Sequence, residues 1–131
     1  MTLKELSQLY HLNREIEIDQ KRLEELKILA ESTSAPLSDI PRNPNIESRL
    51  ERYVAEIIDL TEAIFDKQIR CLRERNRLER HISSIDDSLT RQIFTLRFIS
   101  GFSWAQVAAH IGEVTENRVK LVCNRFLKQK R

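Results

Sequence analysis

The sequence predicts an all-α protein, in which a long, coiled-coil-like antiparallel helical hairpin precedes a C-terminal helix-turn-helix domain of three helices. Composition is the first reason, because 131 residues include only two glycines and three prolines, and 32% are charged. Helical apolar periodicity along two long segments is the second. Short helical segments separated by glycine-containing turns near the C-terminus are the third. We place the hairpin at residues 1–85 and the helix-turn-helix at 86–131.

The first predicted helix runs from Leu3 to about Glu31. Thr2 and Glu5 have the spacing of a capping box, in which each side chain accepts a hydrogen bond from the other residue's backbone N–H. Apolar side chains follow at heptad spacing, with Asp19 as a polar interruption. They are Leu9, Leu12, Ile16, Leu23, Leu26 and Ala30. Such an amphipathic helix needs a partner that covers its apolar side. The prolines of residues 32–45 end it, and we interpret that segment as the hairpin loop.

The second predicted helix, from Ile46 to about Ile82, carries two apolar stripes. The first has heptad spacing and comprises Leu50, Tyr53, Ile57, Leu60, Ile64, Cys71, Leu78 and Ile85. The second lies beside it and comprises Val54, Ile58, Phe65, Ile69 and Leu72. The shorter first helix can cover only one stripe. We therefore expect the other to mediate self-association, most simply as a homodimer. The alternative is that the C-terminal domain folds back over it.

The segment 89–126 has the pattern of a helix-turn-helix. A support helix ending near Ser100 precedes a helix of two turns, Trp104–Ile111, and a longer last helix. Ser103 and Thr115 are suitable N-caps, because their side-chain oxygens accept from unpaired N–H groups of the first turn. Gly112 suits the left-handed conformation that ends many helices.

The last helix is expected to bury one side and expose the other. Apolar residues at helical spacing would point inward: Val119, Val122, Cys123 and Phe126. By elimination, the remaining residues would point outward: Glu116, Asn117, Lys120, Leu121, Asn124 and Lys128, with Arg118 and Arg125 on the flanks. Asparagine suits adenine, and arginine or lysine suits guanine or phosphate, so this side fits the major groove of double-stranded DNA. An ordinary solvated helix face is the alternative.

The stretch LRFISGFSWAQVAAHIGEVTENRVKLV resembles region four of bacterial sigma factors. It is more similar to the sigma-region-four-like phage regulators of the ArpU and RinA type, which share the Leu-Arg-Phe-Ile opening and the Arg-Phe-Leu close. The resemblance covers about the last 40 residues. It implies DNA contacts from the cap threonine and the residues after it, here Thr115, Glu116, Asn117, Arg118 and Lys120. The sequence departs from primary sigma factors in a turn one residue longer, and in Leu121 where glutamine is often found.

The outward side of the last helix and the resemblance to sigma region four together give the predicted DNA-contacting residues. They are Ser103, Thr115, Glu116, Asn117, Arg118, Lys120, Leu121, Asn124, Arg125 and Lys128. Charge supports this placement, because residues 1–86 carry a net charge of −3 and residues 87–131 carry +5.

Other classes of function find little support in the sequence. It has no glycine-rich phosphate loop and no zinc-ligand spacing, so we expect no enzyme activity, metal or cofactor. The separated cysteines, Cys71 and Cys123, are expected to be reduced. No apolar run approaches the roughly 18 residues of a membrane span, so we expect no membrane association and a cytoplasmic protein.

These observations predict a sequence-specific DNA-binding regulator of transcription, and the resemblance implies phage or prophage genes. Two alternatives stay open. One is a DNA-packaging protein like the small terminase subunits, which also combine a helix-turn-helix with an oligomerising hairpin but usually place the DNA module first. The other is an interaction protein that binds RNA polymerase and no DNA. For the regulator too, RNA polymerase stays open as a second partner besides DNA.

Overall fold

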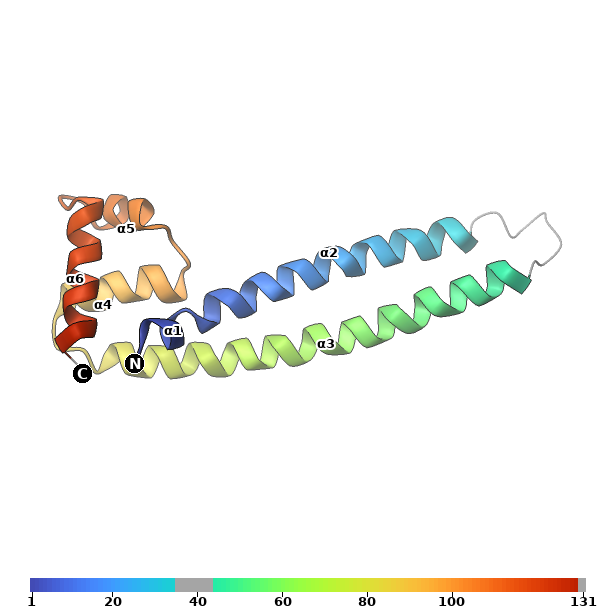
Figure 1. Ribbon diagram of the computed structural model, residues 1–131, viewed down its shortest axis with the longest axis horizontal. Coiled ribbons are helices and arrows are strands. Elements are labelled where there is room, and N and C mark those ends of the chain that lie inside the picture. Colours follow the sequence, from blue (N-terminus) through green and yellow to red (C-terminus); the bar gives the residue numbers. More distant parts are fainter. Residues whose placement is uncertain (35–43, 130–131) are drawn as a thin grey trace. The chain divides into compact units, whose positions relative to one another are not determined.

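The computed structural model describes residues 1–34 and 44–129, and all regular secondary structure in them is helical, as predicted (Figure 1). The chain divides into two compact units. Unit 1 comprises Met1–Asn13 and Arg70–Arg131, and unit 2 comprises Arg14–Ile69. None of the described helices is both long enough and apolar enough to cross a membrane.

Unit 2 consists of parts of two long helices, α2 (Gln8–Ser34) and α3 (Pro44–Ser83). Asp19, which interrupts the apolar stripe of α2, forms an ion pair of 2.5 Å with Lys67 of α3. Further along α2, Arg22 lies 3.6 Å from Glu56. The later residue of α2, Arg22, pairs with the earlier residue of α3, Glu56, so the two helices run antiparallel. Ile16, Leu26 and Ile64 are buried in this unit.

The predicted connector, residues 32–45, falls mostly outside the described residues. α2 continues to Ser34, and α3 begins at Pro44. Proline suits the first position of a helix, because the N–H that it lacks would have no partner within the helix.

Unit 1 contains five further elements. They are α1 (Leu3–Leu6), α4 (Ser88–Phe94), the π-helical turn η2 (Thr95–Ile99), α5 (Trp104–Ile111) and α6 (Glu116–Gln129). One hydrophobic core joins these elements to the ends of α2 and α3. Its buried members are Leu6, Leu9, Leu78, Ile82, Ile85, Ile93, Phe94, Phe98, Val107, Ala108, Val119 and Cys123. The beginning of the chain is therefore built into the same core as the last helix.

The first predicted helix is interrupted, contrary to expectation. Ser7, at φ −85° and ψ −6°, separates α1 from α2 and leaves the regular helical path for one residue. Leu6 and Leu9, on either side of the break, are both buried. Burial of these two apolar side chains offsets the loss of regular geometry. The predicted capping box is present, with Thr2 and Glu5 each bonded to the other's backbone N–H.

The predicted support helix also differs from a regular α-helix, because its last turn is π-helical. The N–H of Ser100 donates to the carbonyl of Thr95 over 3.0 Å, and that of Phe102 donates to Leu96. The Arg97 guanidinium donates to the Phe102 carbonyl over 2.9 Å and lies 4.5 Å from the centroid of the Trp104 ring. These contacts stabilise the widened turn and attach the next loop to it.

Asp87 is the N-cap of α4. Its carboxylate accepts from the hydroxyl of Thr90 over 2.6 Å and from the backbone N–H of Thr90 over 3.1 Å. These two bonds, helped by the nearby Arg91 charge, hold the pKa of Asp87 below its ordinary value of 3.8. The ionised cap therefore contributes stability above pH 3.8, which is lost as pH falls through the lowered pKa.

Replacing Asp87 with asparagine tests this contribution. Asparagine also caps helices but carries no charge. At pH 7 we expect Asp87→Asn to melt at a lower temperature than the parent protein. Thermal unfolding followed by circular dichroism is expected to show this difference shrinking below about pH 4, because both caps are then neutral. A difference that stays constant down to pH 2 would contradict this account.

Candidate nucleic-acid interface

The short helix α5 is fixed at its start by a second capping box. The Ser103 hydroxyl accepts from the backbone N–H of Gln106 over 3.2 Å, and the Gln106 side chain accepts from the N–H of Ser103 over 2.9 Å. Ser103 is therefore the N-cap that the sequence predicts. Val107 and Ala108 of α5 are buried on the side that packs against α6. The small side chain of Ala108 permits this close approach.

The turn between α5 and α6 depends on unusual backbone angles. Gly112 has a positive φ of 76°, as predicted, but its ψ of 156° lies outside the left-handed helical region that was expected. This combination is open essentially to glycine alone. Glu113 follows with a φ of 58°. Thr115 then begins α6, because its hydroxyl accepts from the N–H of Arg118 over 3.1 Å, which confirms the predicted cap.

The inner side of α6 is buried as the sequence predicts. Val119 and Cys123 are each 1% exposed, and Phe126 packs edge-on against Phe94 with ring centroids 5.2 Å apart. Burial raises the pKa of the Cys123 thiol to about 11, and the Arg97 charge offsets part of this rise. Because the inner side is locked by these contacts, the opposite side of α6 is fixed in its outward orientation.

The predicted contact residues on the outer side of α6 lie at the surface. Those classed as exposed are Glu116, Asn117, Arg118, Leu121, Asn124, Arg125 and Lys128. Helical spacing places Asn117, Leu121, Asn124 and Lys128 along one line. Lys120 is half-buried beside this line and forms an ion pair of 3.2 Å with Glu116. The pair holds one acidic and one basic side chain at the start of the helix.

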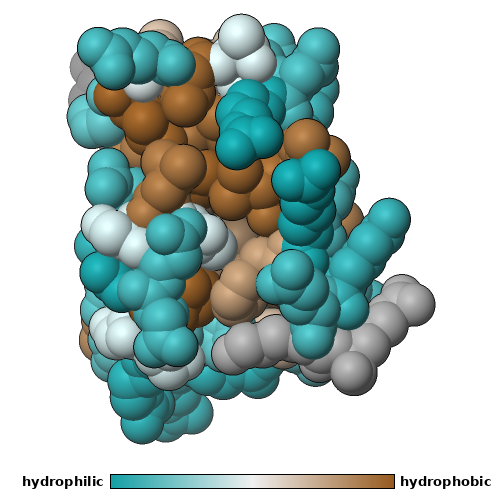
Figure 2. Space-filling model, turned by 90° about the vertical axis from the view of Figure 1, so that its left-hand side faces the viewer, coloured by the Kyte–Doolittle hydropathy of each residue, from teal (hydrophilic) through white to brown (hydrophobic). Residues whose placement is uncertain are grey.

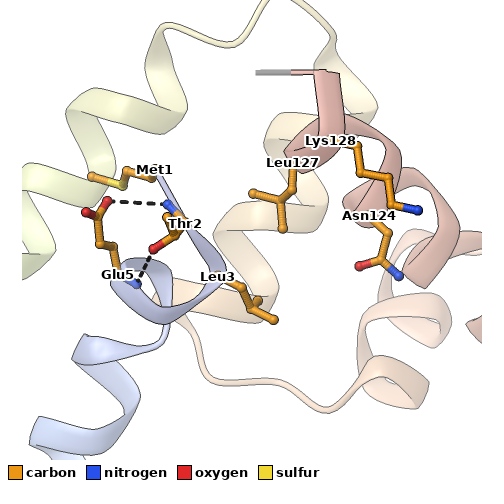
Figure 3. A pocket seen from close by; sticks show the side chains of 7 residues that line it. All are labelled: Met1, Thr2, Leu3, Glu5, Asn124, Leu127 and Lys128. Atoms are coloured by element: carbon orange, nitrogen blue, oxygen red, sulfur yellow. Dashed lines mark hydrogen bonds between the residues drawn. The ribbon is translucent and has the colours of Figure 1, made fainter. Parts of the chain in front are cut away.

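A groove separates the C-terminal half of this surface from the beginning of the chain (Figure 3). Its volume is about 430 Å³, and one wall comes from Asn124, Leu127 and Lys128 of α6. The facing wall is formed by Met1, Thr2, Leu3 and Glu5. The sequence did not predict this neighbour. The capping box of α1 identifies the start of a helix, but no signal in it indicates packing beside residues more than a hundred positions away.

Arg125 belongs to another part of the surface. It lines a separate hollow of about 350 Å³, together with Asp86 and Asp87 at the corner between α3 and α4. The structure therefore brings Asn124 and Lys128 together, but it places Arg125 beside acidic residues on the opposite flank of α6. Ser103, at the start of α5, lines a third hollow with Arg97 and His11.

Apolar side chains also reach the surface of this unit. Leu121 is 41% exposed, and Val122, Phe126 and Leu127 of α6 are half-buried. Figure 2, which views the left-hand side of Figure 1, shows an apolar area bordered by hydrophilic side chains. A leucine on the exposed line of α6 can contact the methyl group of thymine.

The two units differ strongly in charge. Unit 1 contains 14 lysines and arginines against 7 aspartates and glutamates, a net charge of +7. Unit 2 contains 8 against 13, a net charge of −5. The difference in net charge between the two units is larger than that between residues 1–86 and residues 87–131, because the arginines at the end of α3 belong to unit 1. A basic unit with an exposed polar helix has the electrostatic character of a nucleic-acid interface.

Comparison of the chain with models of protein families, with curated proteins and with solved structures gives no match. Among the described residues, no three His, Cys, Asp or Glu side chains form a group suited to a metal ion.

The two cysteines provide a test of the packing of α6. Thiolate is the reactive form, and a pKa of about 11 leaves about one Cys123 thiol in ten thousand ionised at pH 7. Cys71 is only half-buried. We expect iodoacetamide to modify Cys71 in the folded protein and to leave Cys123 unmodified, as mapped by mass spectrometry. Urea-unfolded protein, the control, should be modified at both positions. Equal rates in the folded protein would show that α6 does not pack as described.

Proposed function

We propose that α5, the turn and α6 form a helix-turn-helix that places α6 in the major groove of double-stranded DNA, and that the protein regulates transcription. The observation that carries this proposal is the line of Asn117, Leu121, Asn124 and Lys128 along the exposed side of a helix whose other side is locked in the core. It lies in the unit with a net charge of +7. The resemblance to sigma region four and to ArpU- and RinA-type phage regulators supports the same function.

Each group of residues has a distinct role in the proposed complex. Asn117, Asn124 and Lys120 read base edges, because amides and amines supply donors that the major groove can discriminate. Lys128 and Arg118 contact phosphates on either side of the groove. Arg125 can contact a phosphate only when its side chain moves away from Asp86 and Asp87. Thr115 and Ser103 hold the two helices at the required positions.

The two antiparallel helices α2 and α3 have a separate role in this proposal. The parts of α2 and α3 that lie in unit 2 are held side by side by the ion pair between Asp19 and Lys67. The net charge of −5 in unit 2 disfavours contact with the phosphate backbone. Unit 2 therefore serves protein contacts in this proposal, and unit 1 binds DNA.

Binding sites must first be selected from genomic fragments with the purified protein. We then expect Lys120→Ala with Asn124→Ala to reduce affinity for a selected duplex to that for a scrambled duplex. The reason is that each well-placed base contact is worth about 1–3 kcal/mol of discrimination. Fluorescence anisotropy measures both affinities, at one fixed salt concentration because protein–DNA affinity depends on salt.

A matched variant on unit 2 controls for the loss of one lysine and one amide. Gln20→Ala with Lys21→Ala removes exposed side chains from α2 and is expected to leave both affinities unchanged. Circular dichroism should show full helicity in all variants. If Lys120→Ala with Asn124→Ala binds the selected duplex as tightly as the parent protein, α6 is not the recognition helix. No binding of the parent protein to any duplex at low salt would favour an interaction protein instead.

A further inference from the structure

The helix α3 has an apolar surface that the described part of the chain does not cover. It comprises Val54, Ile58, Phe65 and Leu72, and we name it the α3 stripe. Phe65 and Leu72 are 60% and 61% exposed. Their spacing of seven residues places them on the same side of this continuous helix. Large apolar side chains in a row at the surface of a helix indicate a binding surface.

Charged residues along one edge of the α3 stripe change sign between Asp66 and Arg70. Asp59, Glu62 and Asp66 precede the change, and Arg70, Arg73 and Arg77 follow it. All six are exposed, and their spacing of three or four residues keeps them on the same side of α3. Between residues 59 and 77 this edge is therefore acidic in its first half and basic in its second half.

We propose that the α3 stripe is covered by α3 of a second copy of this chain, running antiparallel and centred near residue 68. A two-fold axis across two antiparallel helices brings the same edge of each together, head to tail. Asp66 then lies opposite Arg70 of the second copy, Glu62 opposite Arg73, and Asp59 opposite Arg77. The midpoint of each pair is at or next to residue 68.

Two members of the α3 stripe, Phe65 and Leu72, have the same centre as the charges, whereas Val54 and Ile58 lie towards one end of the contact. Phe65 and Leu72, the most exposed members of the α3 stripe, have their midpoint between residues 68 and 69, so each faces the other across the two-fold axis. A parallel pair would gather the acidic halves at one end and the basic halves at the other, where like charges repel. The charged pattern, together with the Phe65 and Leu72 pair at the same centre, is what selects a second copy and the antiparallel orientation.

Two charge substitutions test the interface: the first makes one predicted pair like-charged, and the second gives that pair opposite charges again. Glu62→Arg is expected to raise the dissociation constant of the dimer by roughly tenfold or more, because it places two arginines together at two symmetric positions. Adding Arg73→Glu should restore dimerisation, because the pair then has opposite signs again. Sedimentation equilibrium without DNA measures both, so the outcome is independent of the proposed function.

Glu24→Arg makes the same change on the exposed surface of α2 and is the matched control, which should dimerise like the parent protein. All substituted side chains are exposed, and circular dichroism verifies folding. Two results would overturn the proposal. One is a parent protein that stays monomeric at all concentrations. The other is a double variant that dimerises no better than Glu62→Arg.

Chemical cross-linking tests the orientation. In a Cys71→Ser background, Gln68→Cys lies next to the two-fold axis, whereas Val54→Cys lies far from its own copy. A short bis-maleimide is expected to join the Gln68→Cys chains into covalent dimers and to leave Val54→Cys chains single. Cross-linking at both positions would show a parallel pair and contradict the proposal. Cross-linking at neither position would place the dimer contact elsewhere.

Discussion

Leu6, Leu78, Phe94 and Val119 belong to one hydrophobic core, although the first and last are more than a hundred residues apart. The surface of unit 1 depends on this core. Because Val119 and Cys123 are held inside, the line of polar residues on the other side of α6 must face outward. Because Leu6 is held inside, the first residues of the chain lie beside the C-terminal half of α6 and narrow the approach to Asn124 and Lys128. A ligand of α6 therefore also meets α1.

Charge acts over a longer range than these contacts. In the proposed complex, the charge contrast between the two units favours approach of DNA to the basic unit. The excess of +7 is spread over several helices, and Lys120, on the outer side of α6, lies beside the acidic Glu116. Binding by one copy is therefore expected to be weak and strongly dependent on salt.

The sequence predicts well those features that depend on neighbouring residues. Helical periodicity locates the long helices and the inner side of α6, and Ser103, Thr115 and Asp87 are recognisable as caps because capping is decided within four residues. Three features could not be predicted. The break at Ser7 and the groove between α1 and α6 arise from packing between distant segments. The π-helical turn depends on the Arg97 contacts, which periodicity does not reveal.

The two proposals together constrain how the protein would meet DNA. The end of α3 at Ser83 lies 15 residues beyond the proposed centre, which corresponds to about 22 Å at 1.5 Å per residue. In the antiparallel dimer the two copies of this end are therefore about 45 Å apart along the helices. Because a two-fold axis relates the two copies of α6, the proposed dimer would bind an inverted repeat, and the spacing of its half-sites would depend on where α6 lies relative to this end of α3.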